Sequence, residues 1–178
     1  MKKFIFSAFA LCAFAFASCS DDNKGINGET PDYEFIGSHM TFVYNLSGDL
    51  ASMVKVASST TLPATQATIN HSTEGTKHIV TLSNIKCPAK FDIVYQLTPK
   101  DGISIDANQN YSYNLESSFS IIRSFSDGSH IPANSESAPV ISGYVMGKDL
   151  ETFFKNNQTH TYKLNLSTDG FYEDPSEE

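Results

Sequence analysis

Apolar and polar residues alternate one for one along several stretches of this sequence. The clearest stretch sets Phe91, Ile93, Tyr95 and Leu97 between mostly polar neighbours. Because successive side chains of a β-strand point to opposite faces, such a strand has one apolar face and one polar face. The same period recurs in residues 40–46, 111–125 and 162–166. The alternation therefore predicts a protein built mainly from half-buried antiparallel strands.

Turn-forming residues separate these stretches. Proline, glycine, aspartate and serine cluster at residues 99–102 and 126–128, and similar signals interrupt the chain elsewhere. This spacing predicts an all-β fold, an antiparallel β-sandwich of about 7–9 strands over residues 38–172. A closed barrel fits less well, because the predicted strands differ in length and the loops are long.

Two further segments have predicted structures of their own. Leu150, Phe153 and Phe154 are spaced as on one face of a helix, and Asp149 precedes them at a position suited to an N-cap. We therefore expect one short helix before the last strand. Residues 50–56 alternate again after a turn, and they are expected to form a strand.

Residues 1–18 are predicted to be a secretory signal peptide. Lys2 and Lys3 precede an apolar run, and small residues lie just before Cys19. The run is shorter than the roughly 20 residues that a helix needs to cross a bilayer. Its small-small-Cys ending resembles the bacterial lipobox, which implies cleavage before Cys19 and lipidation of the Cys19 thiol. The alternative is an ordinary cleaved signal peptide in which Cys19 has no special role.

Residues 19–37 are expected to be a flexible tether and residues 173–178 a disordered acidic tail, since neither has a periodic apolar pattern. Directly after Cys19, the pair Asp21 and Asp22 resembles the export tag of Bacteroidetes surface lipoproteins. That resemblance implies attachment to the outer membrane, facing the cell exterior. The alternative is a solvated acidic linker on a periplasmic lipoprotein.

The charge of the chain excludes some partners. Its 12 basic and 20 acidic residues give a formal net charge of −8, and Arg123 is its only arginine. Nucleic-acid binding requires a basic patch that displaces counterions from phosphates, and this chain cannot assemble one. Anionic lipid headgroups also repel an acidic protein, so the predicted membrane attachment rests on the N-terminal lipid.

No segment of the sequence matches a catalytic motif. The five histidines lack metal-ligand spacing, and the run Asp-Gly-Ser-His at residues 127–130 is expected to be a turn. Cys87, the one cysteine left after processing and lipidation, is expected to be a small buried residue. No pair of acidic residues stands out as the opposed carboxylates of a polysaccharide hydrolase. The sequence thus predicts a protein that is not an enzyme, with no catalytic residue, no cofactor and no metal site.

Two weaker patterns are candidates for ligand binding. Asp106, Asn108 and Asn110 resemble the opening of an EF-hand calcium loop, but the later glycine and glutamate of that loop are missing, which favours a polar hairpin loop. Tyr111 and Tyr113 share one face of a predicted strand near this loop, where their rings could stack on sugars. The alternative is that both tyrosines belong to the core.

The leader, the acidic tag and the alternating domain together resemble the small immunoglobulin-like lipoproteins of gut Bacteroidetes, many of which have no assigned function. The resemblance implies a lipid-anchored, non-enzymatic surface module that binds a glycan or a partner protein. The alternative is a fimbria-like structural subunit or assembly accessory. Some such subunits are cut at an arginine or lysine to expose a strand-accepting groove, whereas Arg123 lies deep within a predicted strand. Fold alone does not identify function.

Overall fold

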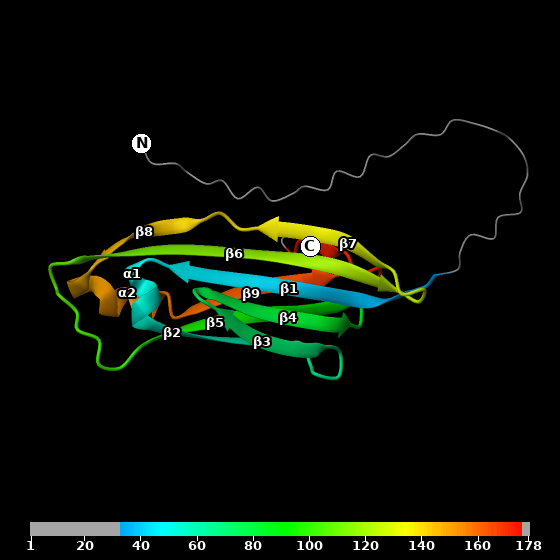
Figure 1. Cartoon of the computed structure of the whole chain (residues 1–178), viewed down its shortest axis with the longest axis horizontal. Coiled ribbons are helices and arrows are strands. Elements are labelled where there is room, and N and C mark those ends of the chain that lie inside the picture. The colour runs from blue at the N-terminus through cyan, green and yellow to red at the C-terminus, as the bar shows by residue number, and fades with distance from the viewer. Residues whose placement is uncertain (1–32, 176–178) are drawn as a thin grey trace, which may run out of the picture. The chain divides into compact units, whose positions relative to one another are not determined.

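Two antiparallel β-sheets pack face to face in the computed structural model, which describes residues 33–175 (Figure 1). The strands are β1 (Phe35–Ser47), β2 (Val54–Thr60), β3 (Thr68–Glu74), β4 (Lys77–Ile85), β5 (Ala89–Pro99), β6 (Asn110–Phe125), β7 (His130–Ser137), β8 (Ile141–Met146), β9 (Thr159–Leu166) and β10 (Tyr172–Glu173). The helices are α1 (Asp49–Met53) and α2 (Leu150–Asn156), and a short 3-10 turn, η1 (Gly147–Asp149), precedes α2.

The first sheet has the order β3-β4-β1-β6-β7, with β8 also paired to β6, and the second has the order β10-β9-β5-β2. The predicted antiparallel β-sandwich is confirmed. The described residues form ten strands, slightly more than the expected 7–9, and the tenth is a pair of only two residues.

The boundaries of the folded unit differ a little from the predicted ones. The predicted signal peptide, Cys19 and most of the tether lie outside the described residues. β1 begins at Phe35, before the predicted boundary at residue 38, and the Phe35 ring packs edge-on to Phe125 at 6.1 Å. Glu173, assigned to the tail from the sequence, belongs to β10, where its carboxylate accepts a hydrogen bond from Asn165.

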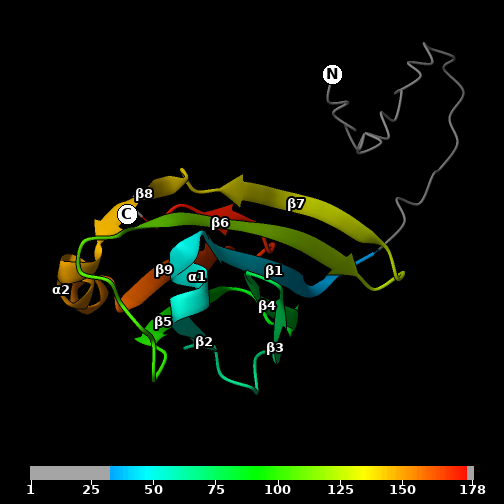
Figure 2. The ribbon, with the colours of Figure 1, turned by 60° about the vertical axis from the view of Figure 1, so that its left-hand side comes forward.

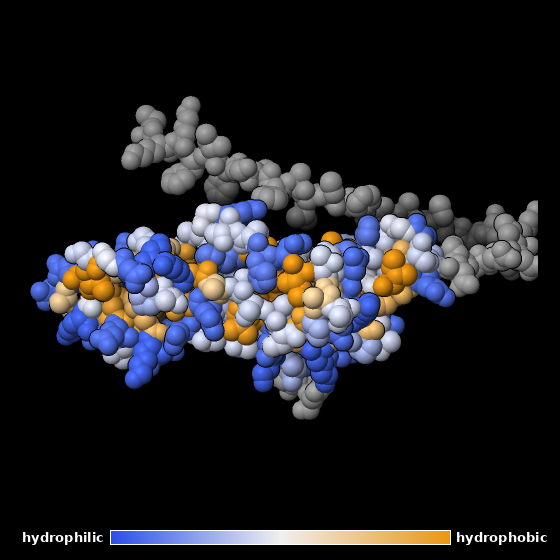
Figure 3. Space-filling view, turned by 90° about the horizontal axis from the view of Figure 1, so that it is seen from below, coloured by the Kyte–Doolittle hydropathy of each residue, from blue (hydrophilic) through white to orange (hydrophobic). Residues whose placement is uncertain are grey.

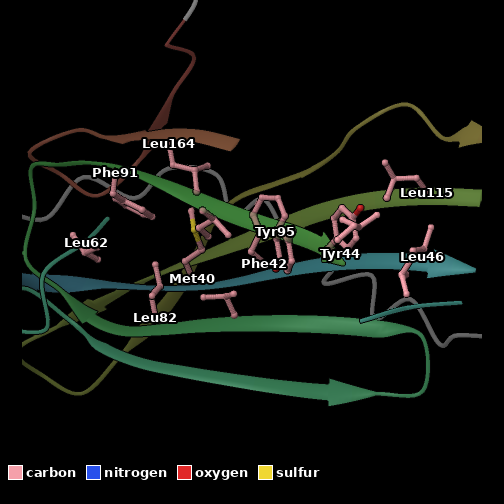
Figure 4. Packing of buried hydrophobic residues seen from close by; sticks show 14 of the residues in the cluster. Met40, Phe42, Tyr44, Leu46, Leu62, Leu82, Phe91, Tyr95, Leu115 and Leu164 are labelled. Carbon is pink, nitrogen blue, oxygen red and sulfur yellow. The ribbon is translucent and has the colours of Figure 1, made fainter. Parts of the chain in front are cut away.

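The core is formed by the apolar faces that the alternation predicts. Phe42 and Tyr44 of β1 meet Ile93 and Tyr95 of β5 between the sheets, and all four are almost fully buried. Figure 4 shows Phe42, Tyr44 and Tyr95 gathered at the centre of this layer, where the rings of Tyr44 and Tyr95 stack at 4.5 Å. Their burial accounts for much of the hydrophobic stabilisation of the fold.

The prediction of a strand over residues 50–56 is wrong for its first half, where α1 forms. Leu50 and Met53, three residues apart, are buried together as neighbours on one helix face. The chain must pass here from β1 in one sheet to β2 in the other, and the helical turn makes that crossing. The carboxylate of Asp49 accepts hydrogen bonds from the backbone N–H and the hydroxyl of Ser112, which fixes the helix against β6.

The short helix predicted before the last strand is present as α2. It buries Leu150 and Phe154 at one end of the sandwich. Asp149 is the N-cap residue, as expected from its position, but its side chain makes no capping hydrogen bond.

Candidate functional site: a groove beside strand β9

One edge of β9 is only partly covered by another strand. β5 pairs with β9 along its whole length, whereas β10 pairs only with Asn165 and Leu166. Among residues 33–175, no strand lies beside residues 159–164 on that side. Figure 2 shows β9 below β6 and β8, on the side of the molecule that carries α2. An uncovered strand edge is a template for pairing with another chain.

The backbone groups on this edge can be assigned from the hydrogen-bond pattern. The N–H of Leu97 donates to the carbonyl of Gln158 at 2.8 Å, and in an antiparallel pair this direction alternates from residue to residue. The N–H and C=O groups of Thr159, Thr161 and Lys163 therefore point away from β5, toward the open edge. For Thr159 and Thr161 these groups have no hydrogen-bond partner within the described part of the chain.

The first sheet has an interruption that faces this edge. β7 pairs with residues 118–124 of β6 and β8 pairs with residues 110–115. Between β7 and β8 the chain passes through Ala138 and Pro139, and the Ala138 N–H donates to the Ser117 carbonyl at 2.9 Å. The outer edge of the first sheet is thus held close to β6 at the point where β9 lacks a neighbour.

A groove separates these two edges. One part has a volume of about 580 Å³ and lies between residues 161–164 and residues 136–139. A second part, of about 460 Å³, continues toward Thr159 and Ile141 and shares Ser117 and Thr161 with the first. We refer to both parts together as the β9 groove. Each part falls within the size range of known ligand-binding sites, about 300–1,000 Å³.

Aromatic side chains form the base of the β9 groove. The Phe42 ring lies 4.7 Å from Tyr162 and 6.3 Å from Phe119. Burial raises the pKa of Tyr162, and a hydrogen bond with Ser117 partly offsets this effect. The base is therefore apolar, while threonine and serine residues lie along its rims.

β10 closes one end of the β9 groove. Tyr172 packs edge-on against Phe119 at 4.9 Å, and its N–H donates to the Asn134 side chain at 2.9 Å. The pKa of Tyr172 is raised by partial burial and by the negative charges of Asp174 and Glu136. Two carboxylates therefore lie close to Tyr172, and Lys163 also lines this part of the β9 groove.

Of the sugar-stacking candidates from the sequence, Tyr111 lies in the core and Tyr113 packs against it. Tyr111 is only 7% exposed, and its hydroxyl accepts a hydrogen bond from the backbone N–H of Asp106 at 2.9 Å. Tyr113 is half-buried, with its ring 5.1 Å from that of Phe153 in α2. Tyr111 thus has no open ring face on which a sugar could stack.

The loop with the calcium-like spacing forms a turn. The Asp106 carboxylate accepts a hydrogen bond from the Asn108 N–H at 2.9 Å, and Asn110 begins β6. Within residues 33–175, no three His, Cys, Asp or Glu side chains cluster closely enough to hold a metal ion.

The predicted turn at residues 127–130 is confirmed. The Asp127 carboxylate accepts a hydrogen bond from the Ser129 N–H, while Nδ1 of His130 lies 2.9 Å from the Ser124 hydroxyl. Cys87 is half-buried, and burial raises the pKa of its thiol. A raised pKa lowers the thiolate fraction and with it the reactivity of the thiol.

A smaller internal cavity lies under α2, beside Tyr44. It holds about 60 Å³, and Leu46, Leu115 and Phe153 are among its apolar lining residues. The Tyr44 hydroxyl is the one buried side-chain polar atom without a hydrogen-bond partner in the described part of the chain. Cavities that hold a benzene-sized ligand are near 150 Å³, so this space is too small for such a molecule.

Sequence reasoning missed Tyr144, the tyrosine that the structure exposes most. Tyr144, on β8, is 76% exposed, and it pairs with Ser112 on the outer face of the first sheet. The only sequence feature that pointed to Tyr144 is the short alternation of apolar and polar residues around Gly143.

Figure 3 views the molecule from below, and on that face apolar residues form small areas separated by polar ones.

Comparison of the chain with protein-family models, curated proteins and solved structures found no match. Within residues 33–175, neither helix has the length or the apolar composition to cross a membrane.

Proposed function

We propose that this chain is a lipid-anchored, non-enzymatic module of the outer membrane, facing the cell exterior, that binds a partner protein in the β9 groove. The observation that carries the proposal is the open edge of β9 beside an apolar base. Thr161, with its unpaired backbone groups, lines the same part of the groove as the Phe42, Phe119 and Tyr162 rings. Thr159 lines the adjoining part, which also contains Tyr162. Apolar surface next to directional polar groups is the usual composition of a binding site.

A protein partner fits this groove better than a glycan does. Backbone N–H and C=O groups in a row complement another peptide backbone. Of the tyrosines that the sequence suggested for sugar stacking, Tyr111 is buried in the core and Tyr113 packs against it.

Site-specific photo-crosslinking on intact cells would test the proposal. A photoreactive residue at Thr161 should give a discrete crosslinked partner protein, identified by mass spectrometry. The same residue at Ser72, exposed on β3, is the matched control and should not crosslink that protein. Equal crosslinking from both positions, or none from Thr161, would contradict the proposed site.

The anchor and the location need separate tests, because Cys19 lies outside the described residues. Metabolic labelling with an alkyne fatty acid should label the chain, and Cys19→Ala should abolish the label. Protease treatment of intact cells should digest the domain if it faces the exterior. Its survival while a known surface protein is digested would place it in the periplasm.

A glycan remains a second candidate ligand because of Tyr144. Further along β6 from Ser112, which pairs with Tyr144, the Glu116 carboxylate accepts hydrogen bonds from Asn114 and Asn45. An aromatic ring next to ordered polar groups is suited to sugar stacking. Retention on a polysaccharide in affinity electrophoresis that is lost in Tyr144→Ala would favour this candidate.

The fimbria-like alternative predicts polymers of this chain. Arg123 lies within β6, paired with both β1 and β7, so cleavage after it would cut a central strand. A ladder of SDS-resistant oligomers on cells would favour that alternative over the module proposed here.

A further inference from the structure

We propose that the ligand of the β9 groove is an extended segment of another protein, which adds to the open edge of β9 as a strand and inserts apolar side chains at alternate positions. This inference rests on the proposed function and names the kind of partner. It concerns how the partner binds, so it can fail while the β9 groove still binds a protein.

β10 shows how a strand fits at this edge. It pairs with Asn165 and Leu166, and its Tyr172 ring turns inward onto Phe119. The pairing ends at Glu173, and Pro175, which has no N–H, follows two residues later. A strand from another protein would continue the same line along residues 159–163, with every second side chain directed at the base of the β9 groove.

The backbone of β9 is prepared for this addition. Thr159 and Thr161 each direct one donor and one acceptor toward the open edge, and both residues are exposed. Their spacing of two residues is the repeat of a β-ladder, so an incoming strand in register would satisfy both. Strand addition at a sheet edge is a known mode of peptide recognition, in which the backbone gives affinity and the pockets give specificity.

The two segments that flank the described residues, 20–32 and 176–178, are unsuited to the groove. Residues 20–32 include one large apolar side chain, Ile26, and residues 176–178 include none. Neither segment can place apolar groups at alternate positions over Phe42 and Phe119. Residues 1–18, as the predicted signal peptide, would be removed by cleavage. An apolar, extended segment of another protein therefore fits the groove better than either flanking segment does.

Charge argues against a second copy of this chain as that molecule. Two copies with a formal net charge of −8 each repel one another. At the β10 end of the groove, Glu136 and Asp174 add negative charge close to Tyr172. A segment with a basic residue close to Glu136, and alternating apolar residues over Phe42 and Phe119, complements the site.

Binding of a synthetic peptide to the chain from residue 20 onward tests the inference. The probe is a fluorescent peptide of about nine residues that alternates valine with threonine and carries a lysine at each end. Two further peptides carry N-methyl groups on alternate amides. The first is methylated at the odd-numbered amides and the second at the even-numbered amides. Only one set faces β9, so one methylated peptide should bind about tenfold or more weakly and the other should bind as the parent does.

A protein variant provides an independent test. Thr161→Pro removes an N–H that makes no bond within the fold, whereas Thr161→Ala keeps it. The proline variant should weaken peptide binding about tenfold, and the alanine variant should leave it unchanged.

Equal effects of the two methylated peptides, or no binding of the parent peptide, would overturn strand addition. A specific crosslink from Thr161 in that case would still support a partner bound by another mode, while its absence would contradict the proposed function itself.

Discussion

The guanidinium group of Arg123 lies 4.2 Å from the centre of the Phe171 ring. Its Nε atom also donates to the Asp169 carbonyl at 2.6 Å. These contacts fasten the segment before β10 to β6. Since Phe171 precedes Tyr172, the only arginine of the chain holds in place the residue that closes one end of the β9 groove.

Replacing Arg123 should therefore destabilise the fold. Arg123→Met keeps the length of the side chain but removes the cation–π contacts and the hydrogen bond to Asp169. We expect the free energy of unfolding to fall by about 1–2 kcal/mol, measured by urea denaturation. Arg123→Lys retains the charge and should lose less. Equal stability of the wild type and Arg123→Met would show that these contacts contribute nothing to folding.

Gly170→Ala should destabilise the same region. Gly170 has φ of +79°, and an added Cβ would lie 2.3 Å from the Ser38 hydroxyl and 2.5 Å from the Phe35 ring. Gly102→Ala is a matched control, because its φ of +74° is similar but no atom lies within 4 Å of the added Cβ. Gly170→Ala should lower the melting temperature clearly more than Gly102→Ala does. An equal decrease in the two variants would mean that the close packing around Gly170 is not required.

Tyr44→Phe should stabilise the protein. The buried hydroxyl of Tyr44 has no hydrogen-bond partner, and removing such a group relieves a cost of about 1–3 kcal/mol. Tyr95→Phe is the control, since the Tyr95 hydroxyl donates to the His78 carbonyl at 3.3 Å and its loss should destabilise. Thermal unfolding of both variants measures the difference. A loss of stability in Tyr44→Phe would indicate that an ordered water bonds the hydroxyl.

The stability of the fold should decrease as the pH falls below about 7. Burial lowers the pKa of His160, and it also lowers the pKa values of His39 and His78. As the pH falls, these histidines therefore bind protons in the unfolded chain before they do so in the folded chain, near the ordinary pKa of about 6.5. Unfolding becomes easier as the pH falls through that value. The loss should level off below the folded-state pKa values. Urea denaturation between pH 5.5 and 8 measures the slope, which should be smaller in His160→Gln; an unchanged slope in this variant would contradict the assignment to His160.

The sequence was sufficient to predict which faces of the strands are buried. The burial of Phe42 and Tyr95 could be predicted from their immediate neighbours in the sequence, because apolar and polar residues alternate wherever a strand has one buried and one solvent-exposed face. The exception was α1. There Leu50 and Met53 lie within a span too short to distinguish a helical turn from alternation.

The candidate site could not be predicted, because it depends on which strands are neighbours. The faces of Thr161 and Tyr162 follow from the alternation, but the open edge of β9 follows from the shortness of β10 and the break at Pro139. No local pattern encodes that arrangement. Tyr111 and Tyr113 were suggested because of their spacing, which fits a buried face as well as a binding face. The role of Arg123 likewise emerged only from contacts with residues far along the chain.

Amide hydrogen exchange resolved by NMR tests the central claim most directly. In the free chain from residue 20 onward, the Thr159 and Thr161 amides should exchange fast, and the intervening His160 amide, which faces β5, should exchange slowly. With the partner or the alternating peptide bound, the Thr159 and Thr161 amides should become protected. A Thr161 amide already as protected as that of His160 in the free protein, or still unprotected in the complex, would contradict binding at the open edge of β9.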